Sequence, residues 1–139
     1  MPPKAAHPDP ASMPRTSASL TEGYISAYAA KDAATYLNLF SKEADYFDFA
    51  VQVHAKIKLL RDELRRSFHR KEFRLTFHSS FVSPDGRFAA LQGTYNDTTR
   101  AGDPTSVPIA SILEFQNGEI VKETLYYDGS LFKRHLHAS

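Results

Sequence analysis

The sequence contains no cysteine and no long hydrophobic run. Without cysteine the chain cannot form a disulfide bond, a thiolate metal site or a cysteine nucleophile, and this composition fits a cytoplasmic location. No apolar segment approaches the ~20 residues that a membrane-spanning helix needs, so we expect no membrane partner. The amino terminus also lacks the hydrophobic core of a secretory signal, and we therefore expect no secretion.

The sequence also lacks an excess of charge of either sign: its formal net charge is only +1 at pH 7. Nucleic-acid binding normally needs a clear basic excess, so we expect no nucleic-acid partner. We predict no metal site, because His135 and His137 fall in a tail and His54 has no partner at ligand spacing. Neither a glycine-rich phosphate loop nor a nucleophile elbow is present, and we expect no cofactor.

The residues that are present suit one folded domain. The chain has 139 residues and a hydrophobic fraction of 42%, which is enough to bury a single core. Five of its eight prolines fall in residues 1–19, where they prevent helix formation. We therefore predict a disordered proline-rich tail over 1–19, an ordered domain over 20–132 and a carboxyl-terminal tail over 133–139.

The periodicity of apolar residues predicts two helices, one strand, a long helix and then four strands. One helix begins near Leu20 with Thr21 as its cap, and a second, short helix is capped by Asp32. The strongest apolar stripe predicts a long helix over 55–71, whose arginines form a solvated face. Residues 44–49, which precede this helix, are predicted to form a strand. After the helix the period changes to two, and strands are predicted over 74–82, 87–98, 107–115 and 119–128. Helices segregated from a mainly antiparallel sheet indicate the α+β class.

This order of elements resembles the nuclear-transport-factor-two-like superfamily, specifically its SnoaL-like, ketosteroid-isomerase-like and scytalone-dehydratase-like branches. The resemblance covers roughly residues 20–132. It rests on Tyr24-Ile25, Lys31-Asp32, the strand segment 45–48 and the closing strand 118–128. It implies a cone-shaped barrel in which the long helix lies across a strongly curved sheet and leaves an apolar pocket. The superfamily contains isomerases, cyclases, dehydratases and non-catalytic proteins, so the fold does not select one reaction.

The resemblance places Asp48 where ketosteroid-isomerase-like members carry a general base. Those enzymes usually follow the base with proline, whereas Phe49 follows here and would contact the substrate. Burial among aromatic rings would raise the pKa of such a carboxylate and favour proton abstraction next to a carbonyl. The alternative is an aspartate that caps the following turn. Tyr24 resembles the oxyanion-hole tyrosine of the same branch, and Ser111 aligns with the protonated aspartate that accompanies it.

The dehydratase-like branch offers a second set of candidates. Tyr28, Tyr46 and His78 fall at places corresponding to its tyrosines and one histidine, although Ala29 stands where that branch has an acid. Strand alternation leaves open whether His78 faces the pocket or solvent.

A late acid offers a third candidate. Asp128 resembles the late acid of SnoaL-type cyclases, but alternation places Tyr127 on the opposite face. If Tyr127 lines the pocket, Asp128 enters it only through a bend at Gly129.

Together these residues predict a cofactor-independent acid/base enzyme, an isomerase, cyclase or dehydratase. Its ligand would be a small hydrophobic carbonyl compound such as a polyketide-type metabolite. The rival hypothesis is a non-catalytic binding or dimerisation module of the same fold. In either case we expect a homodimer, formed through the apolar outer face of the strands.

Overall fold

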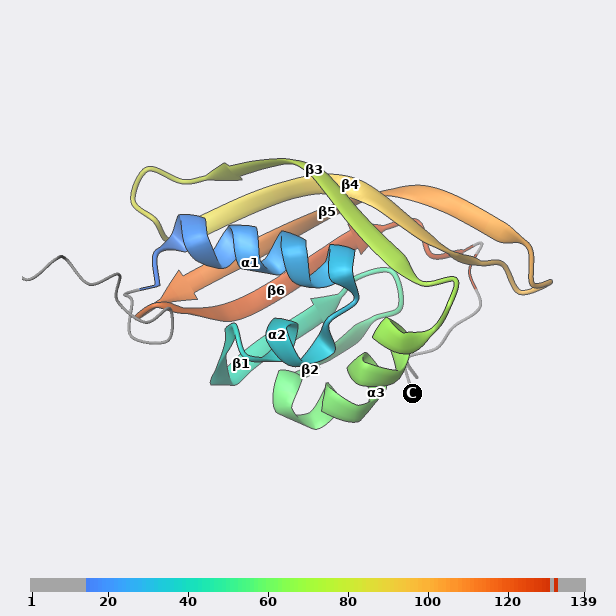
Figure 1. Cartoon of the computed structure of the whole chain (residues 1–139), viewed down its shortest axis with the longest axis horizontal. Helices are drawn as coiled ribbons and strands as arrows, with labels where there is room; N and C mark the ends of the chain where they lie inside the picture. The colour runs from blue at the N-terminus through green and yellow to red at the C-terminus, as the bar shows by residue number, and fades with distance from the viewer. Residues whose placement is uncertain (1–14, 131, 133–139) are drawn as a thin grey trace, which may run out of the picture.

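The computed structural model describes residues 15–130 and 132 and contains three helices and one six-stranded sheet (Figure 1). The α+β prediction is confirmed. The helices are α1 (Ser17–Ala30), α2 (Ala33–Leu37) and α3 (Ile57–His69). The strands are β1 (Phe40–Asp48), β2 (Val53–Lys56), β3 (Arg74–Val82), β4 (Phe88–Thr98), β5 (Pro104–Gln116) and β6 (Glu119–Tyr127).

The sheet has the strand order β2-β1-β6-β5-β4-β3, and only the pair β1–β6 is parallel. It curves so that β3 and β1 lie on opposite sides of α1 (Figure 1). Helix α1 packs mainly on β3, and α3 packs on β1. Two helices therefore share the inner face of the sheet, whereas the resemblance implied that one long helix lies across it.

Helix α1 begins inside the segment predicted to be a tail. Thr16 and Ser19 form a reciprocal capping box, in which each side chain accepts the backbone N–H of the other residue. Thr21, which we predicted as the cap, lies one turn inside the helix and donates its hydroxyl to the carbonyl of Ser17. Residues 1–14 and 133–139 lie outside the described residues.

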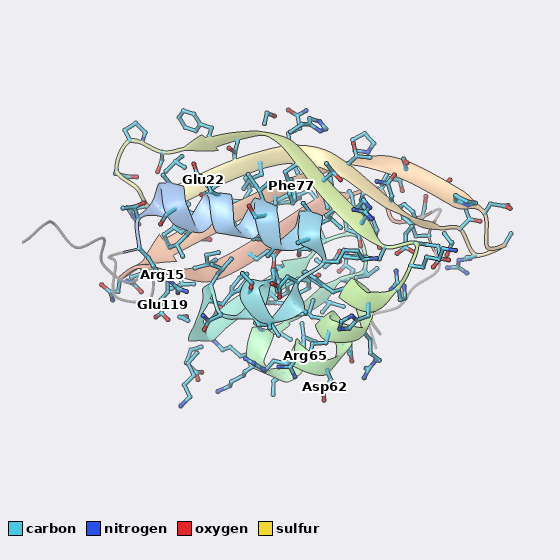
Figure 2. All side chains as sticks on the ribbon, in the orientation of Figure 1. Arg15, Glu22, Asp62, Arg65, Phe77 and Glu119 are labelled. Carbon is cyan, nitrogen blue, oxygen red and sulfur yellow. The ribbon has the colours of Figure 1, made fainter. Side chains whose placement is uncertain are left out.

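Helix α3 is amphipathic, as its sequence predicts. Its buried residues include Ile57, Leu64 and Phe68. Asp62 and Arg65 project from its outer side, while Phe77 lies between β3 and α1 (Figure 2). The helix is shorter than predicted, because Val53–Lys56 forms the edge strand β2, which pairs with β1. Ala55 and Lys56 are good helix formers, so only this pairing makes them a strand.

A bulge in β3 between Phe77 and Ser79 contributes to the curvature of the sheet. Gly93 lies opposite Phe77 on β4, where a Cβ atom would be 2.0 Å from the carbonyl oxygen of Thr76. Only glycine allows this close approach of the two strands. Within the described residues, every helix is too short or too polar to cross a lipid bilayer.

Candidate active site

A small cavity lies between α3 and the inner face of the sheet. About 40 Å³ of it is open to the centres of water-sized molecules, which is roughly three times the minimum that holds one water. Most of its wall is aromatic or aliphatic. The lining residues that carry a polar group are Tyr28, Tyr46, Asp48, Ser67, Arg70, Tyr95 and Tyr127. The cavity thus has the composition of a small-molecule site, an apolar wall with a few polar groups.

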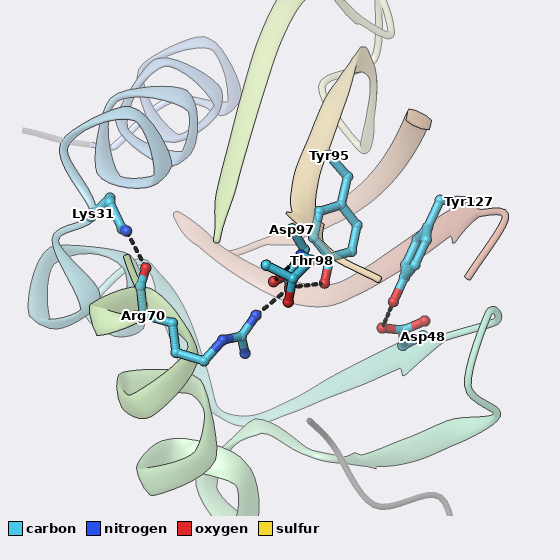
Figure 3. Close-up of polar contacts among 7 residues, drawn as sticks. All are labelled: Lys31, Asp48, Arg70, Tyr95, Asp97, Thr98 and Tyr127. Atoms are coloured by element: carbon cyan, nitrogen blue, oxygen red, sulfur yellow. Dashed lines mark hydrogen bonds and ion pairs between the residues drawn. The ribbon is translucent and has the colours of Figure 1, made fainter. Parts of the chain in front are cut away.

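Asp48 is the carboxylate of this cavity. It ends β1 with 2% of its surface exposed, on the inward side of the strand with Tyr46. Its Oδ2 accepts the hydroxyl of Tyr127 at 2.9 Å (Figure 3). The same oxygen accepts the hydroxyl of Tyr46 at 3.5 Å. Its Oδ1 accepts the backbone N–H of Ala50 at 3.1 Å. The carboxylate therefore caps the turn after β1, as the alternative interpretation proposed, and also faces the cavity.

Two tyrosines hold one oxygen of Asp48 in place. Burial, followed by the charges of Asp48 and Glu123, raises the pKa of Tyr46 well above its ordinary value. Tyr46 therefore stays protonated at neutral pH and can only donate to an ionised Asp48. Tyr127 comes from β6, whose Leu125 is the register partner of Asp48.

A second buried carboxylate, Glu123, was missed from the sequence. It has no exposed surface, and its two oxygens accept the hydroxyls of Tyr24, Tyr28 and Tyr36, with 2.9 Å between Tyr28 Oη and Oε2. Burial raises the pKa of Glu123 to about 7, while the three phenol hydrogen bonds act in the opposite direction. The cluster joins both amino-terminal helices to β6. A signal was present, because Glu123 lies on the same strand face as Leu125 and Tyr127.

The Glu123 cluster and the cavity meet at Tyr28. Its ring lines the cavity and stacks on Phe68 with 4.9 Å between the ring centroids, while its hydroxyl points away to Glu123. Tyr24 donates to Glu123 and also lies 2.8 Å from the hydroxyl of Ser111. Burial is the main cause that raises the pKa of Tyr24 and Tyr28 well above the ordinary value.

A third buried carboxylate, Asp97 on β4, fastens the end of α3 to the sheet. It forms an ion pair with Arg70 and accepts the hydroxyl of Tyr95 and the backbone N–H of Thr98, both at 2.8 Å (Figure 3). Lys31 Nζ donates to the backbone carbonyl of Arg70. These contacts join β4 and the end of α1 to the residue that follows α3. Nothing in the local sequence around Asp97 indicated this pairing.

The structure brings together four of the predicted site residues at the cavity. They are Tyr28, Tyr46, Asp48 and Tyr127. Tyr24 and Ser111 are fully buried beside Glu123, and neither lines the cavity. The two residues predicted to form an oxyanion hole therefore lie beside a carboxylate, but that carboxylate is Glu123 and not Asp48.

The three remaining predicted site residues also lie outside the cavity. His78 is exposed, because Leu75 and Phe77 occupy the inward positions of β3. Phe49 is 44% exposed and stacks on Tyr126, which is on the outer face of β6.

Asp128 follows the end of β6, is exposed, and accepts the backbone N–H of Ser130 at 3.0 Å. The bend that could have carried Asp128 into the cavity does not occur. Among the described residues, no group of three histidine or acidic side chains could hold a metal ion.

Comparison with solved structures finds the same architecture. A hypothetical protein with a ketosteroid isomerase-like fold from Catenulispora acidiphila, in complex with trimethylamine, matches with a TM-score of 0.67 at 18% identity, over 81% of this chain and 88% of that one. A protein from Pseudomonas putida, provisionally assigned as a polyketide cyclase, matches with a TM-score of 0.64 at 19% identity, over 81% and 91%. An NTF2-like protein of unknown function from Cytophaga hutchinsonii gives 0.67 at 14% identity, over 85% and 95%.

The curved sheet and its enclosed helices define the class: this is a nuclear-transport-factor-two-like cone. A search of the curated proteins found no match. The family model for the SnoaL-like domain matches residues 21–123, and the chain belongs to that family.

Proposed function

We propose that the protein is a cofactor-independent acid/base enzyme that removes a proton next to the carbonyl group of a small hydrophobic compound. Asp48 is the general base. The observation that carries this proposal is the position of Asp48, a buried carboxylate on the wall of an apolar cavity, with two phenols directed at one oxygen. A base held in this way has a defined direction for proton transfer.

The two tyrosines determine how Asp48 works. Hydrogen bonds from Tyr46 and Tyr127 to Oδ2 stabilise the ionised carboxylate, while burial acts against it. When Asp48 takes a proton from carbon, these phenols remain as neutral donors. Isomerisation, aldol-type cyclisation and dehydration all begin with this step, so the geometry supports the reaction class without selecting one member.

The cavity limits what can enter. Its open volume of about 40 Å³ admits only a few heavy atoms. Its walls are largely apolar and include Leu64 from α3 and Leu125 from β6. We therefore propose that the reactive end of a polyketide-type carbonyl compound enters, in line with the cyclase assignment of the Pseudomonas putida relative.

The test is Asp48→Asn, with exchange of the α-hydrogens of cyclopentanone for deuterium as the assay. Loss of the base should slow protein-catalysed exchange by on the order of 10²-fold or more. Asp45→Asn is the matched control, because Asp45 lies on the same strand but is only partly buried and pairs with Lys56 at 3.1 Å. Equal exchange by both variants would remove Asp48 from the role of base.

A specific observation also favours the expected homodimer. The outer face of the sheet carries a groove of about 540 Å³, and all ten residues that line it are uncharged. Phe81 and Tyr126 on this groove are 64% and 44% exposed. Exposed apolar patches of this kind mark association sites, and an uncharged patch can meet its own copy without like-charge repulsion.

Sedimentation equilibrium of the wild type, Phe81→Glu and Leu59→Glu tests the dimer. Phe81→Glu places charges inside the interface and should weaken association at least tenfold. Leu59 on α3 is 73% exposed and lies away from the groove, so Leu59→Glu should leave association unchanged. A wild type that is monomeric at every concentration rejects the homodimer.

A further inference from the structure

The proposed reaction needs a donor for the carbonyl oxygen, and the predicted donors are not available. Tyr24 is fully buried and donates its hydroxyl to Glu123, and His78 is exposed on the outer face of the sheet. Tyr46 lines the cavity but donates to Asp48. The charge that develops on an enolate oxygen must be stabilised by some other group, because such stabilisation is a large contribution to catalysis of this type.

Ser67 is a polar side chain on the cavity wall with an unused hydroxyl. It belongs to the buried face of α3, and only 8% of its surface is exposed. Across residues 15–130 and 132 its Oγ has no hydrogen-bond partner. Its backbone carbonyl accepts the N–H of Arg70, but the side chain takes no part in that contact. A buried hydroxyl without a partner is unfavourable, because it has lost its hydrogen bonds to water, so its presence needs an explanation.

Arg70 lines the same cavity three residues after Ser67, on the same side of the helix end. Its Nη2 is held by Asp97, and its guanidinium lies over the ring of Phe73 at 5.5 Å from the centroid. In the described part of the chain the bond to Asp97 is its only side-chain hydrogen bond. A guanidinium has five N–H groups, so Arg70 is oriented by Asp97 and retains donors for a ligand.

The two donors lie on α3 and at its end, whereas Asp48 comes from β1. A carbonyl compound in the cavity can therefore contact both walls at once. Before the reaction the negative charge is on Asp48. After proton transfer it is on the carbonyl oxygen, and a positive guanidinium beside that oxygen stabilises the product of the step.

We propose that Ser67 and Arg70 form the oxyanion site of this protein and bind the enolate oxygen of its substrate. This inference rests on the proposed function. In the step, the carboxylate of Asp48 accepts the α-proton and the C–H electron pair forms the C=C bond. The carbonyl π pair moves to oxygen, where the Ser67 hydroxyl and an Arg70 N–H donate to it. Return of the proton from Asp48 to the same or another carbon restores the base.

Cyclopentane-1,3-dione, which is an enolate at neutral pH, is a compact probe for this site. Its affinity for the wild type, Ser67→Ala, Arg70→Lys and Ser26→Ala is measured by ligand-observed NMR titration. Neutral cyclopentanone, which has the same ring, is titrated in parallel. Arg70→Lys keeps the positive charge for Asp97, and Ser26 on α1 is an exposed serine without a side-chain hydrogen bond among the described residues.

Ser67→Ala and Arg70→Lys should each weaken dione binding about tenfold or more, since each removes a hydrogen bond to a charged oxygen. Cyclopentanone binding should change much less, which a purely structural role for these residues would not produce. Ser26→Ala should bind both compounds as the wild type does. No dione binding by the wild type, or unchanged binding by both site variants, overturns the oxyanion site. A loss in Arg70→Lys alone overturns the assignment of Ser67.

The same samples separate this inference from the proposed function. If Ser67→Ala loses the dione but no variant or wild type exchanges cyclopentanone, the oxyanion site stands as a binding site and the acid/base reaction is wrong. If Asp48→Asn abolishes exchange while Ser67→Ala and Arg70→Lys bind the dione as the wild type does, the reaction stands and the oxyanion site is wrong.

Discussion

Asp48 and Glu123 are both buried carboxylates that accept tyrosine hydroxyls, on the adjacent strands β1 and β6. They differ in what lies on their open side. Asp48 ends its strand and faces a cavity, whereas Glu123 is in mid-strand and is covered by Tyr28 and two further phenols. The same chemical group therefore serves two purposes. Access to a ligand, rather than burial or hydrogen bonding, separates the candidate base from the residue that holds the helices to the sheet.

The largest expected effect is on stability, from Glu123→Leu. Leucine removes the acceptor of three phenols, and the hydroxyls of Tyr28 and Tyr36 would be left buried without a partner. We expect a loss of about 3–5 kcal/mol in the free energy of unfolding. Urea denaturation followed by circular dichroism measures it. A loss below about 1 kcal/mol would show that the cluster does not hold the helices.

The titration of Glu123 should make stability depend on pH. Its pKa is about 7 in the folded protein and near 4.5 when exposed, so the folded state keeps a proton that the unfolded state has lost. The contribution of Glu123 to the free energy of unfolding is complete below pH 4.5. It falls as the pH rises from 4.5 to 7 and is lost above about 7. The difference is on the order of 3 kcal/mol.

Glu123→Gln is the matched variant for this pH dependence, because glutamine does not titrate. Comparing urea midpoints of the two proteins from pH 4.5 to 8 isolates the contribution of Glu123 from that of other groups. If the urea midpoints of the two proteins change with pH in parallel, Glu123 is ionised over the whole range. The three phenols would then stabilise a buried carboxylate that does not titrate in this interval.

The smallest effects are expected when one tyrosine beside Asp48 and one tyrosine beside Glu123 are each replaced by phenylalanine. Tyr127→Phe removes a hydrogen bond to Asp48 and should slow cyclopentanone exchange roughly tenfold, while unfolding changes by about 1 kcal/mol or less. Tyr36→Phe removes a bond to Glu123 and should lower stability by about 1–2 kcal/mol with exchange nearly unchanged. If both variants lose exchange equally, the two regions act as one site.

Much of the fold follows from local patterns. The stripe that includes Ile57, Leu64 and Phe68 has helical spacing, and the Asn117-Gly118 turn joins two alternating strands, so α3 and the β5–β6 hairpin were predictable. The strand β2 was not predictable. Its four residues have no decisive preference, and pairing with β1 alone determines their conformation.

Some residues of the candidate site could be predicted from the sequence, and others could not. Asp48 and Tyr46 were identified by their resemblance to positions in two branches of the superfamily, and their spacing of two residues on one strand explains why both face inward. Whether a residue such as His78 faces inward depends on which side of the sheet the helices cover, and no single strand contains that information.

The sequence by itself determined the α+β class, the strongest helix and the aromatic strand that ends in Asp48, because these depend on neighbours within a few residues. The tertiary structure decided that Asp48 lines the cavity and that Glu123 is covered by tyrosines. It also decided that Ser67 and Arg70 line the same cavity as Asp48. These relations join residues far apart in the chain, and they arise only when a curved sheet closes on its helices.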